Sequence, residues 1–154
     1  MSFLINSSVA IYRGWFTTYT PFQSTLEFWG TLSDEAVVGI GTVELTTSPQ
    51  PRSTERNSLT LHDVLHVSTL SCNAFGQPIL KGGAYTVMFG EYGAAKGGVT
   101  EASGRMVAYF DHESPAFGLK VFEPTGRVLG PSMLGHGGFW LNDCHWSAGE
   151  RARW

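Results

Sequence analysis

The chain has 154 residues, a net charge of −3 and 15% charged residues, well below the usual quarter. This length favours one domain over residues 1–154, with a core large enough to need no metal or disulfide. We expect no nucleic-acid partner because Lys and Arg do not cluster, and no membrane partner because no apolar run approaches about 18 residues.

The first part of the chain predicts two strands and a corner. Phe3–Ile11 alternates weakly and predicts an edge strand. The aromatic residues of Trp15–Phe22 then predict a corner. Leu26–Leu32 follows with a clean alternation of apolar and polar residues, which predicts the second strand.

Val37–Leu45 is the stretch with the strongest strand composition, because most of its residues are β-branched or glycine. Gly39 and Gly41 are two positions apart and therefore lie on one face. Without side chains there, another backbone, an aromatic ring or a ligand can come close. Thr46–Ser58 carries two prolines and many hydroxyls, and it predicts the longest loop.

Leu59–Val67 predicts another strand in which the apolar residues at 59, 61, 65 and 67 share a face with Asp63. His62 and His66 share the opposite face. They lie about 13 Å apart on one strand, too far to bind the same metal ion. We interpret His66 as structural.

The remaining strands are short and are separated by glycine-rich turns, which include Gly97-Gly98 and Gly104. They are predicted at Tyr85–Phe89, Met106–Phe110, Phe117–Phe122 and Phe139–Asn142. Apolar residues never recur at helical spacing for three turns. The fold class is therefore predicted as all-β, a small closed or partly open barrel of short antiparallel strands.

The order of these stretches resembles the small barrel domain of copia-type retrotransposon Pol polyproteins, above all the standalone fungal proteins that carry it. The resemblance implies a retropepsin-like barrel. It runs through Trp15–Phe22, Val37–Leu45, Leu59–Val67, Leu70–Asn73, Gly76–Leu80, Val107–Asp111, Gly130–Ser132, Gly137-Gly138 and Glu150–Trp154.

A retropepsin needs Asp-Ser/Thr-Gly, in which the aspartate shares a proton with the aspartate of a partner subunit. No aspartate of this chain begins that motif, and the matching place holds Asn6-Ser7-Ser8. An amide cannot share a proton in this way. We therefore expect that the barrel is kept and that proteolysis is lost.

Four residues are candidates for acid or base chemistry. Asp63 is a lone carboxylate on an aliphatic face, where desolvation raises a carboxyl pKa. We favour an architectural role for it, as a hydrogen-bond acceptor, over a catalytic one. His112, His136 and His145 lie in loops or at strand ends, where histidines transfer protons near neutral pH or are simply solvated. No spacing predicts a metal site or a cofactor.

The aromatic residues exceed what a small barrel needs to fill its middle. As walls of a site for a flat or apolar molecule we predict Trp15, Tyr19, Phe28, Trp29, Tyr85, Tyr109 and Trp140. The same rings could instead form a protein–protein interface, since Trp and Tyr dominate binding hot spots.

Two functions follow from these patterns. The first is a cofactor-independent barrel that binds a small apolar or aromatic molecule and accelerates an intramolecular cyclisation or isomerisation. The alternative is a pseudo-protease that serves as an interaction or dimerisation module, and residual aspartic protease activity is a distant third. We also expect a homodimer, two reduced cysteines (Cys72 and Cys144) and, without an export signal, a cytoplasmic location.

Overall fold

The computed structural model describes residues 7–28, 34–76, 84–92, 95–114, 117–122, 139–141 and 144–154; for residues 28, 91, 92, 139–141 and 144 it describes the backbone alone. These residues are predominantly in strands, as the sequence predicts. The strands are β1 Val9–Ala10, β2 Phe16–Phe28, β3 Glu35–Thr47, β4 Asn57–His66, β5 Asn73–Phe75, β6 Tyr85–Tyr92, β7 Ala95–Glu101, β8 Met106–Asp111, β9 Gly118–Leu119, β10 Val121–Phe122, β11 Phe139–Leu141 and β12 Cys144–His145. A 3-10 turn at Arg13–Trp15 and the short helix α1, Ala148–Arg151, complete the described elements.

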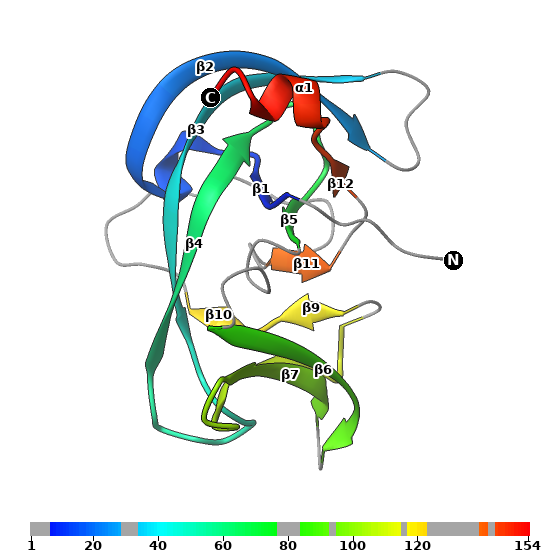
Figure 1. The fold of residues 1–154 in the computed structure, drawn as a ribbon. Helices are drawn as coiled ribbons and strands as arrows, with labels where there is room; N and C mark the ends of the chain where they lie inside the picture. The colour runs from blue at the N-terminus through cyan, green and yellow to red at the C-terminus, as the bar shows by residue number, and fades with distance from the viewer. Residues whose placement is uncertain are drawn as a thin grey trace.

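The described strands form one hydrogen-bonded path, in the order β12-β2-β3-β4-β1-β5-β11-β9-β8-β7-β6, and β10 pairs with β3. Within the described residues the path does not close into a barrel, because β12 and β6 stand at its two ends. Figure 1 shows β2, β3 and β4 curving along one side, with β6 and β7 at the lower end. Two pairings are parallel, β1 with β4 and β5 with β11, so the predicted purely antiparallel arrangement is wrong.

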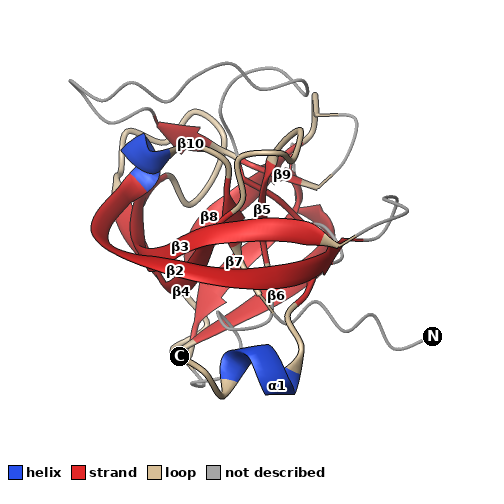
Figure 2. Cartoon of the chain, turned by 90° about the horizontal axis from the view of Figure 1, so that it is seen from above, coloured by secondary structure: helices blue, strands red, loops and turns tan. Residues whose placement is uncertain are grey.

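The long strands β2 and β3 have 13 residues each, so the prediction of short strands is also wrong for this layer. The expected aromatic corner at Trp15–Phe22 is instead the end of the 3-10 turn, at Trp15, and the first part of β2, from Phe16. Pro21 lies inside the strand. Proline is tolerated there because β12 pairs only with Glu27 and Phe28, so that no described strand pairs with the other edge of β2 at Pro21. Viewed from above, the two strands run side by side through the molecule (Figure 2).

The glycine face of β3 is confirmed. A Cβ on Gly39 would lie 2.2 Å from the ring of Tyr19, and a Cβ on Gly41 would lie 2.0 Å from the carbonyl oxygen of Thr18. An aromatic ring thus fills the space above one glycine, and a neighbouring backbone fills it above the other.

A β-bulge in β4 changes which residues are buried. Gly41 pairs with Val64 and Val43 pairs with Leu61, so His62 and Asp63 together face one residue of β3. Asp63 adopts a left-handed conformation, with φ 52°, and is exposed. The predicted common face of Asp63 with the apolar residues of the strand is therefore wrong, because a bulge reverses the alternation beyond it.

Two further predictions fail for topological reasons. Val9–Ala10 is no edge strand but a fully buried one between β4 and β5. Gly97-Gly98 is no turn: it lies within β7, where Cβ atoms would lie 2.1 Å from the Met88 carbonyl oxygen and 2.2 Å from that of Ala108. Gly104, with φ 83°, does sit in the predicted turn.

The hydrophobic core packs the long strands β3 and β4 against β7 and β8. One cluster packs Val43 and Leu45 of β3 and Leu59 and Leu61 of β4 with residues of β7 and β8. A second cluster, farther along the long strands, includes Leu26, Val37, Ile40 and Trp146. Burial of each of these side chains contributes about 1.5–3 kcal/mol, so packing between the layers holds the fold together.

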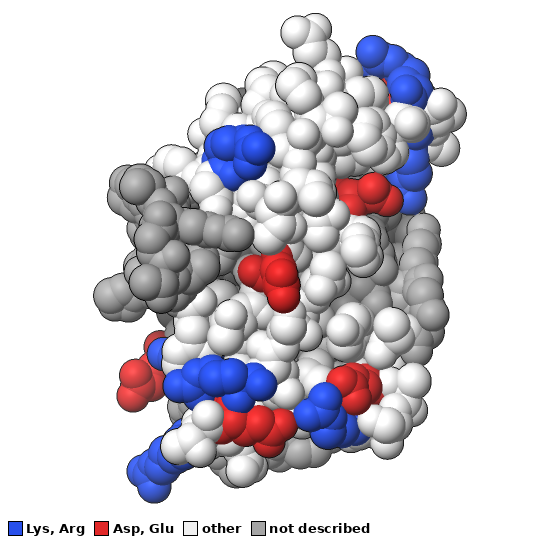
Figure 3. Space-filling model, turned by 90° about the vertical axis from the view of Figure 1, so that its left-hand side faces the viewer, with Lys and Arg blue, Asp and Glu red and all other residues white. Residues whose placement is uncertain are grey.

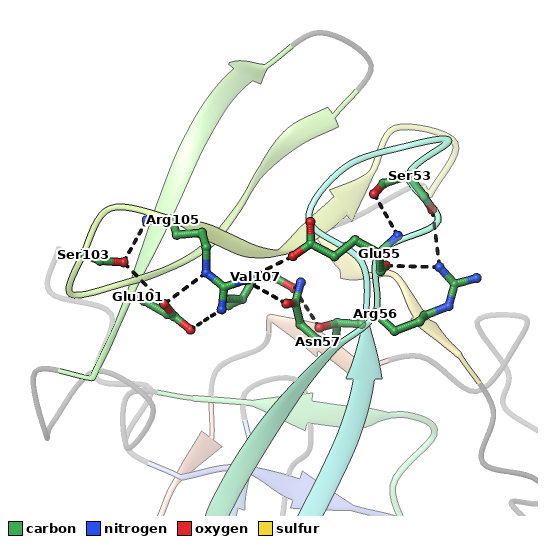
Figure 4. Close-up of polar contacts among 9 residues, drawn as sticks. Ser53, Glu55, Arg56, Asn57, Glu101, Ser103, Arg105 and Val107 are labelled. Atoms are coloured by element: carbon green, nitrogen blue, oxygen red, sulfur yellow. Dashed lines mark hydrogen bonds and ion pairs between the residues drawn. The ribbon is translucent and has the colours of Figure 1, made fainter.

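A polar network ties the β3–β4 connection to the β7–β8 turn (Figure 4). Arg105 contacts Glu101 at 2.7 Å, Glu55 at 3.1 Å and Asn57 Oδ1 at 3.1 Å, and Asn57 Nδ2 donates to the Val107 carbonyl at 3.2 Å. The predicted Thr46–Ser58 loop is shorter than expected, because β3 continues to Thr47 and β4 begins at Asn57.

The C-terminal residues pack on β2. Trp146 is buried, its Nε1 donates to Ser24 Oγ at 2.9 Å, and Ser24 Oγ donates to Glu150 at 2.7 Å. The α1 helix begins after Ser147, whose side chain accepts from the Glu150 backbone N–H. Figure 1 places α1 at the end opposite β6 and β7.

Charged side chains are sparse on the face drawn in Figure 3, and basic and acidic groups lie close to one another rather than in a single-sign patch. Among the described residues, no helix is long and apolar enough to cross a membrane.

Candidate functional site

Four phenylalanines form a continuous contact from the core to the surface. Phe75 and Phe110 are fully buried and stack with ring centroids 5.9 Å apart, and Phe110 also stacks on Phe89 at 6.0 Å. Phe117 meets Phe89 edge-on at 5.0 Å. Phe89 is 55% exposed and Phe117 is 39% exposed. These two exposed rings, which we call the aromatic patch, are held in place by the buried rings beneath them.

Phe89 of the patch lies on β6, the last strand of the described path, and Phe117 lies just before β9. β6 pairs with β7 and ends the hydrogen-bonded path of the described residues, so its other backbone edge has no strand beside it there. Tyr85 and Val87 of β6 pack partly against the core, and Phe89 follows on the same side. β6 therefore offers backbone donors and acceptors next to exposed rings.

A second cluster, made of Arg13, Tyr19 and His66, lies where β2, β3 and β4 meet. The Tyr19 hydroxyl is 2.9 Å from His66 Nδ1 and 3.2 Å from the Val38 carbonyl oxygen. The Arg13 guanidinium lies 4.0 Å from the centre of the Tyr19 ring. Gly39 provides the room for this ring, which explains why the glycine is needed.

Burial lowers the pKa of His66, a hydrogen bond with the Ile11 backbone raises it, and the charge of Arg13 lowers it further, so that the net shift is downward. The downward shift favours the neutral imidazole, whose Nδ1 can accept a hydrogen bond from the Tyr19 hydroxyl. When Nδ1 is itself protonated, Tyr19 can donate to Val38 instead. The pair can therefore move a proton at a half-buried position.

The predicted ligand-binding aromatics do not form one wall. Trp15 is buried within the core, Tyr19 and Tyr85 pack partly against the same core, and Tyr109 is buried in β8. Burial, with the charge of Asp111, raises the pKa of Tyr109. Trp29 and the side chains of Phe28 and Trp140 lie outside the described residues. Where they are described, these rings mainly fill the interior.

The predicted acid–base residues are placed on separate elements. Asp63 is exposed in the β4 bulge, His112 is exposed in the turn after β8, and His145 is half-buried in β12. These elements are not neighbours in the sheet. His136 lies outside the described residues. The desolvation that motivated Asp63 as an acid or base is absent, because the residue faces solvent.

The residues that stand out in the structure were only partly visible in the sequence. The sequence indicates a structural role for His66, and nothing in its own strand indicates contact with Tyr19, which lies 47 positions away. Phe89 continues the apolar alternation of Tyr85 and Val87, which by itself indicates a buried ring. Its exposure follows from the place of β6 at the end of the described path, which the local pattern does not show.

Searches for similar proteins found no matching family model, no matching curated protein and no matching solved structure.

Proposed function

We propose that the protein is a non-catalytic interaction module that binds an extended protein segment along β6 and over the aromatic patch. The observation that carries this proposal is the pair of exposed rings, Phe89 and Phe117, beside the edge of β6 that no other described strand pairs with. Strand addition supplies backbone hydrogen bonds, and an adjacent apolar site supplies specificity. Exposed rings backed by a rigid core are typical of binding hot spots.

The size of the patch supports an extended segment as the occupant. A Phe side chain has about 200 Å² of surface, so the exposed fractions of Phe89 and Phe117 together leave roughly 190 Å² of apolar surface. Burying this area would contribute about 5 kcal/mol. Association costs about 4–15 kcal/mol in lost freedom. The rings alone barely meet this cost, so a partner that also bonds the β6 backbone fits better than one that covers only the rings.

In a pseudo-protease, the serines at the expected protease position would serve the fold rather than catalysis. Ser7 and Ser8 are buried, and the Ser8 Oγ accepts from the Gly76 backbone N–H at 3.1 Å. The Ser8 carbonyl accepts from the Leu65 backbone N–H at 2.9 Å. These groups join neighbouring segments of the fold. The retropepsin-like origin is part of this proposal, with the module as the use to which the protease fold has been put.

The test is selection from a phage-displayed library of random peptides of about twelve residues, long enough for an ordinary strand. Selected peptides are then measured against Phe89→Ser, Phe117→Ser and the control Val38→Ser, which changes an exposed apolar side chain on β3. We expect each aromatic substitution to weaken binding by about tenfold or more and the control to have no effect. Failure to select any peptide, or binding that is indifferent to both phenylalanines, contradicts the proposal.

The Tyr19–His66 contact favours a second candidate function. This function is acid–base chemistry on a small apolar or aromatic molecule, such as a cofactor-free cyclisation or isomerisation. The test is a thermal-shift screen with aromatic metabolites, in which a ligand at 100 times its Kd adds about 2.7 kcal/mol. Tyr19→Phe keeps the ring and removes the proton donor. A ligand that is turned over equally by wild type and Tyr19→Phe refutes this role for the pair.

A further inference from the structure

We infer that the segment bound by β6 is β6 of a second copy, so that the protein forms a two-fold dimer by antiparallel pairing of these strands. The inference rests on the proposed function and names its partner. It is carried by the backbone edge, the charge and the face pattern of one strand.

The edge of β6 lacks the usual protection against pairing. Edge strands avoid association through lysines, prolines or inward-pointing charges. Tyr85–Tyr92 contains no lysine, arginine or proline, and its single charged residue is Glu91, near the end of the strand. The central residues therefore present an uncharged edge next to the aromatic patch.

The conformation of β6 limits the part that can pair. Gly90 has φ 134°, and the pairing with β7 shifts register between Phe89 and Tyr92. The regular part is thus Tyr85–Phe89, which pairs residue by residue with β7. A two-fold pairing that uses all of it places Val87 opposite Val87 of the second copy.

This register keeps the apolar side of the strand continuous across the dimer. Tyr85, Val87 and Phe89 share the side that packs on the core or on Phe110. With Val87 at the centre, Phe89 lies opposite Tyr85 of the second copy, and the two-fold axis generates this pair twice. Aromatic pairs directly opposite one another stabilise antiparallel strands.

The experiment is sedimentation velocity of the full chain between about 1 and 100 µM, the range in which small interfaces associate. The predicted result is a monomer that converts to a dimer, with slower hydrogen exchange of residues 84–90 at the higher concentration. Phe89→Lys should weaken dimerisation by at least about 30-fold. Val38→Lys, which adds the same charge at an exposed site on β3, should leave it unchanged.

Thr86→Lys provides a second variant that keeps both exposed phenylalanines. Thr86 is exposed, so the fold tolerates the change, and the two lysines would lie about 7 Å apart near the two-fold axis. Their repulsion should weaken the dimer, and added salt should restore part of it. A chain that is monomeric throughout the range overturns the inference, as does a dimer indifferent to Phe89→Lys and Thr86→Lys. If the monomer still binds selected peptides through Phe89, the proposed function stands and only its partner is wrong.

Discussion

Substitution of Gly39 by alanine tests the contact on which the Tyr19–His66 cluster depends. The new Cβ would lie 2.2 Å from the Tyr19 ring, so the ring must move away from His66. Overpacking of this kind costs about 1–3 kcal/mol. Alanine also restricts the unfolded chain and returns about 0.4–1 kcal/mol. We therefore expect Gly39→Ala to lower the free energy of unfolding by about 1–2 kcal/mol.

The assay is a double-mutant cycle with Tyr19→Ala, followed by urea unfolding monitored by tryptophan fluorescence. Without the Tyr19 ring, the clash is gone and the cost of Gly39→Ala should largely disappear. Gly41→Ala is the contrast, because its Cβ would lie 2.0 Å from the Thr18 backbone oxygen. That loss should persist when Tyr19 is alanine. Gly149→Ala, which has nothing within 4 Å, is the harmless control.

A coupling free energy near zero between Gly39→Ala and Tyr19→Ala would refute this reasoning. It would mean that the ring is not seated on the glycine in solution.

Three other predictions use the same unfolding assay. The folded-state pKa of His66 lies below its ordinary value of 6.5, so the folded protein binds fewer protons than the unfolded chain. The stability that is present above pH 6.5 should therefore fall as the pH falls through the folded-state pKa. His66→Asn should flatten this pH dependence between about pH 7 and 5, and an unchanged slope would contradict it. Asp63→Val should cost about 1–2 kcal/mol because a β-branched residue resists φ 52°, whereas Asp63→Asn should change stability by about 1 kcal/mol or less; equal effects would disprove the bulge. Ser24→Ala should cost about 1–2 kcal/mol by removing the hydrogen bond from buried Trp146, and an unaltered urea midpoint would contradict that.

The strand β3 could be predicted from the sequence because its signal is local. β-branched residues and glycines at alternate positions specify a strand with one bare face, whatever surrounds it. The structure adds which groups occupy that face. Tyr19 and Thr18 lie about twenty positions earlier in the chain, and no local pattern joins them to Gly39 and Gly41.

The bulge in β4 could not be predicted because its sequence fits either arrangement. Leu59–Val67 alternates as well in a regular strand as in one with an extra residue at Asp63. Only pairing with β3 decides where the extra residue goes. Since one inserted residue turns Asp63 from the core to solvent, the predicted chemistry of this carboxylate depended on information that the strand itself lacks.

The aromatic patch could be foreseen in composition but not in position. Thirteen per cent aromatic residues indicate either a ligand cavity or an interface. Trp15 is buried and Phe89 is exposed. The strand order accounts for the exposure of Phe89, because β6 ends the described path. The sequence likewise predicts a turn at Gly97-Gly98, because the local pattern does not show the neighbouring strands that pack closely on these glycines.

We propose that β6 and the aromatic patch bind an extended protein segment. The most direct test of this proposal is an amide NMR titration of the full chain with a peptide selected from the library. We expect chemical-shift changes concentrated in Tyr85–Phe89 and around Phe117, with slower exchange of β6 amides. Binding that instead shifts residues around Tyr19 and His66, and leaves β6 unchanged, would contradict it.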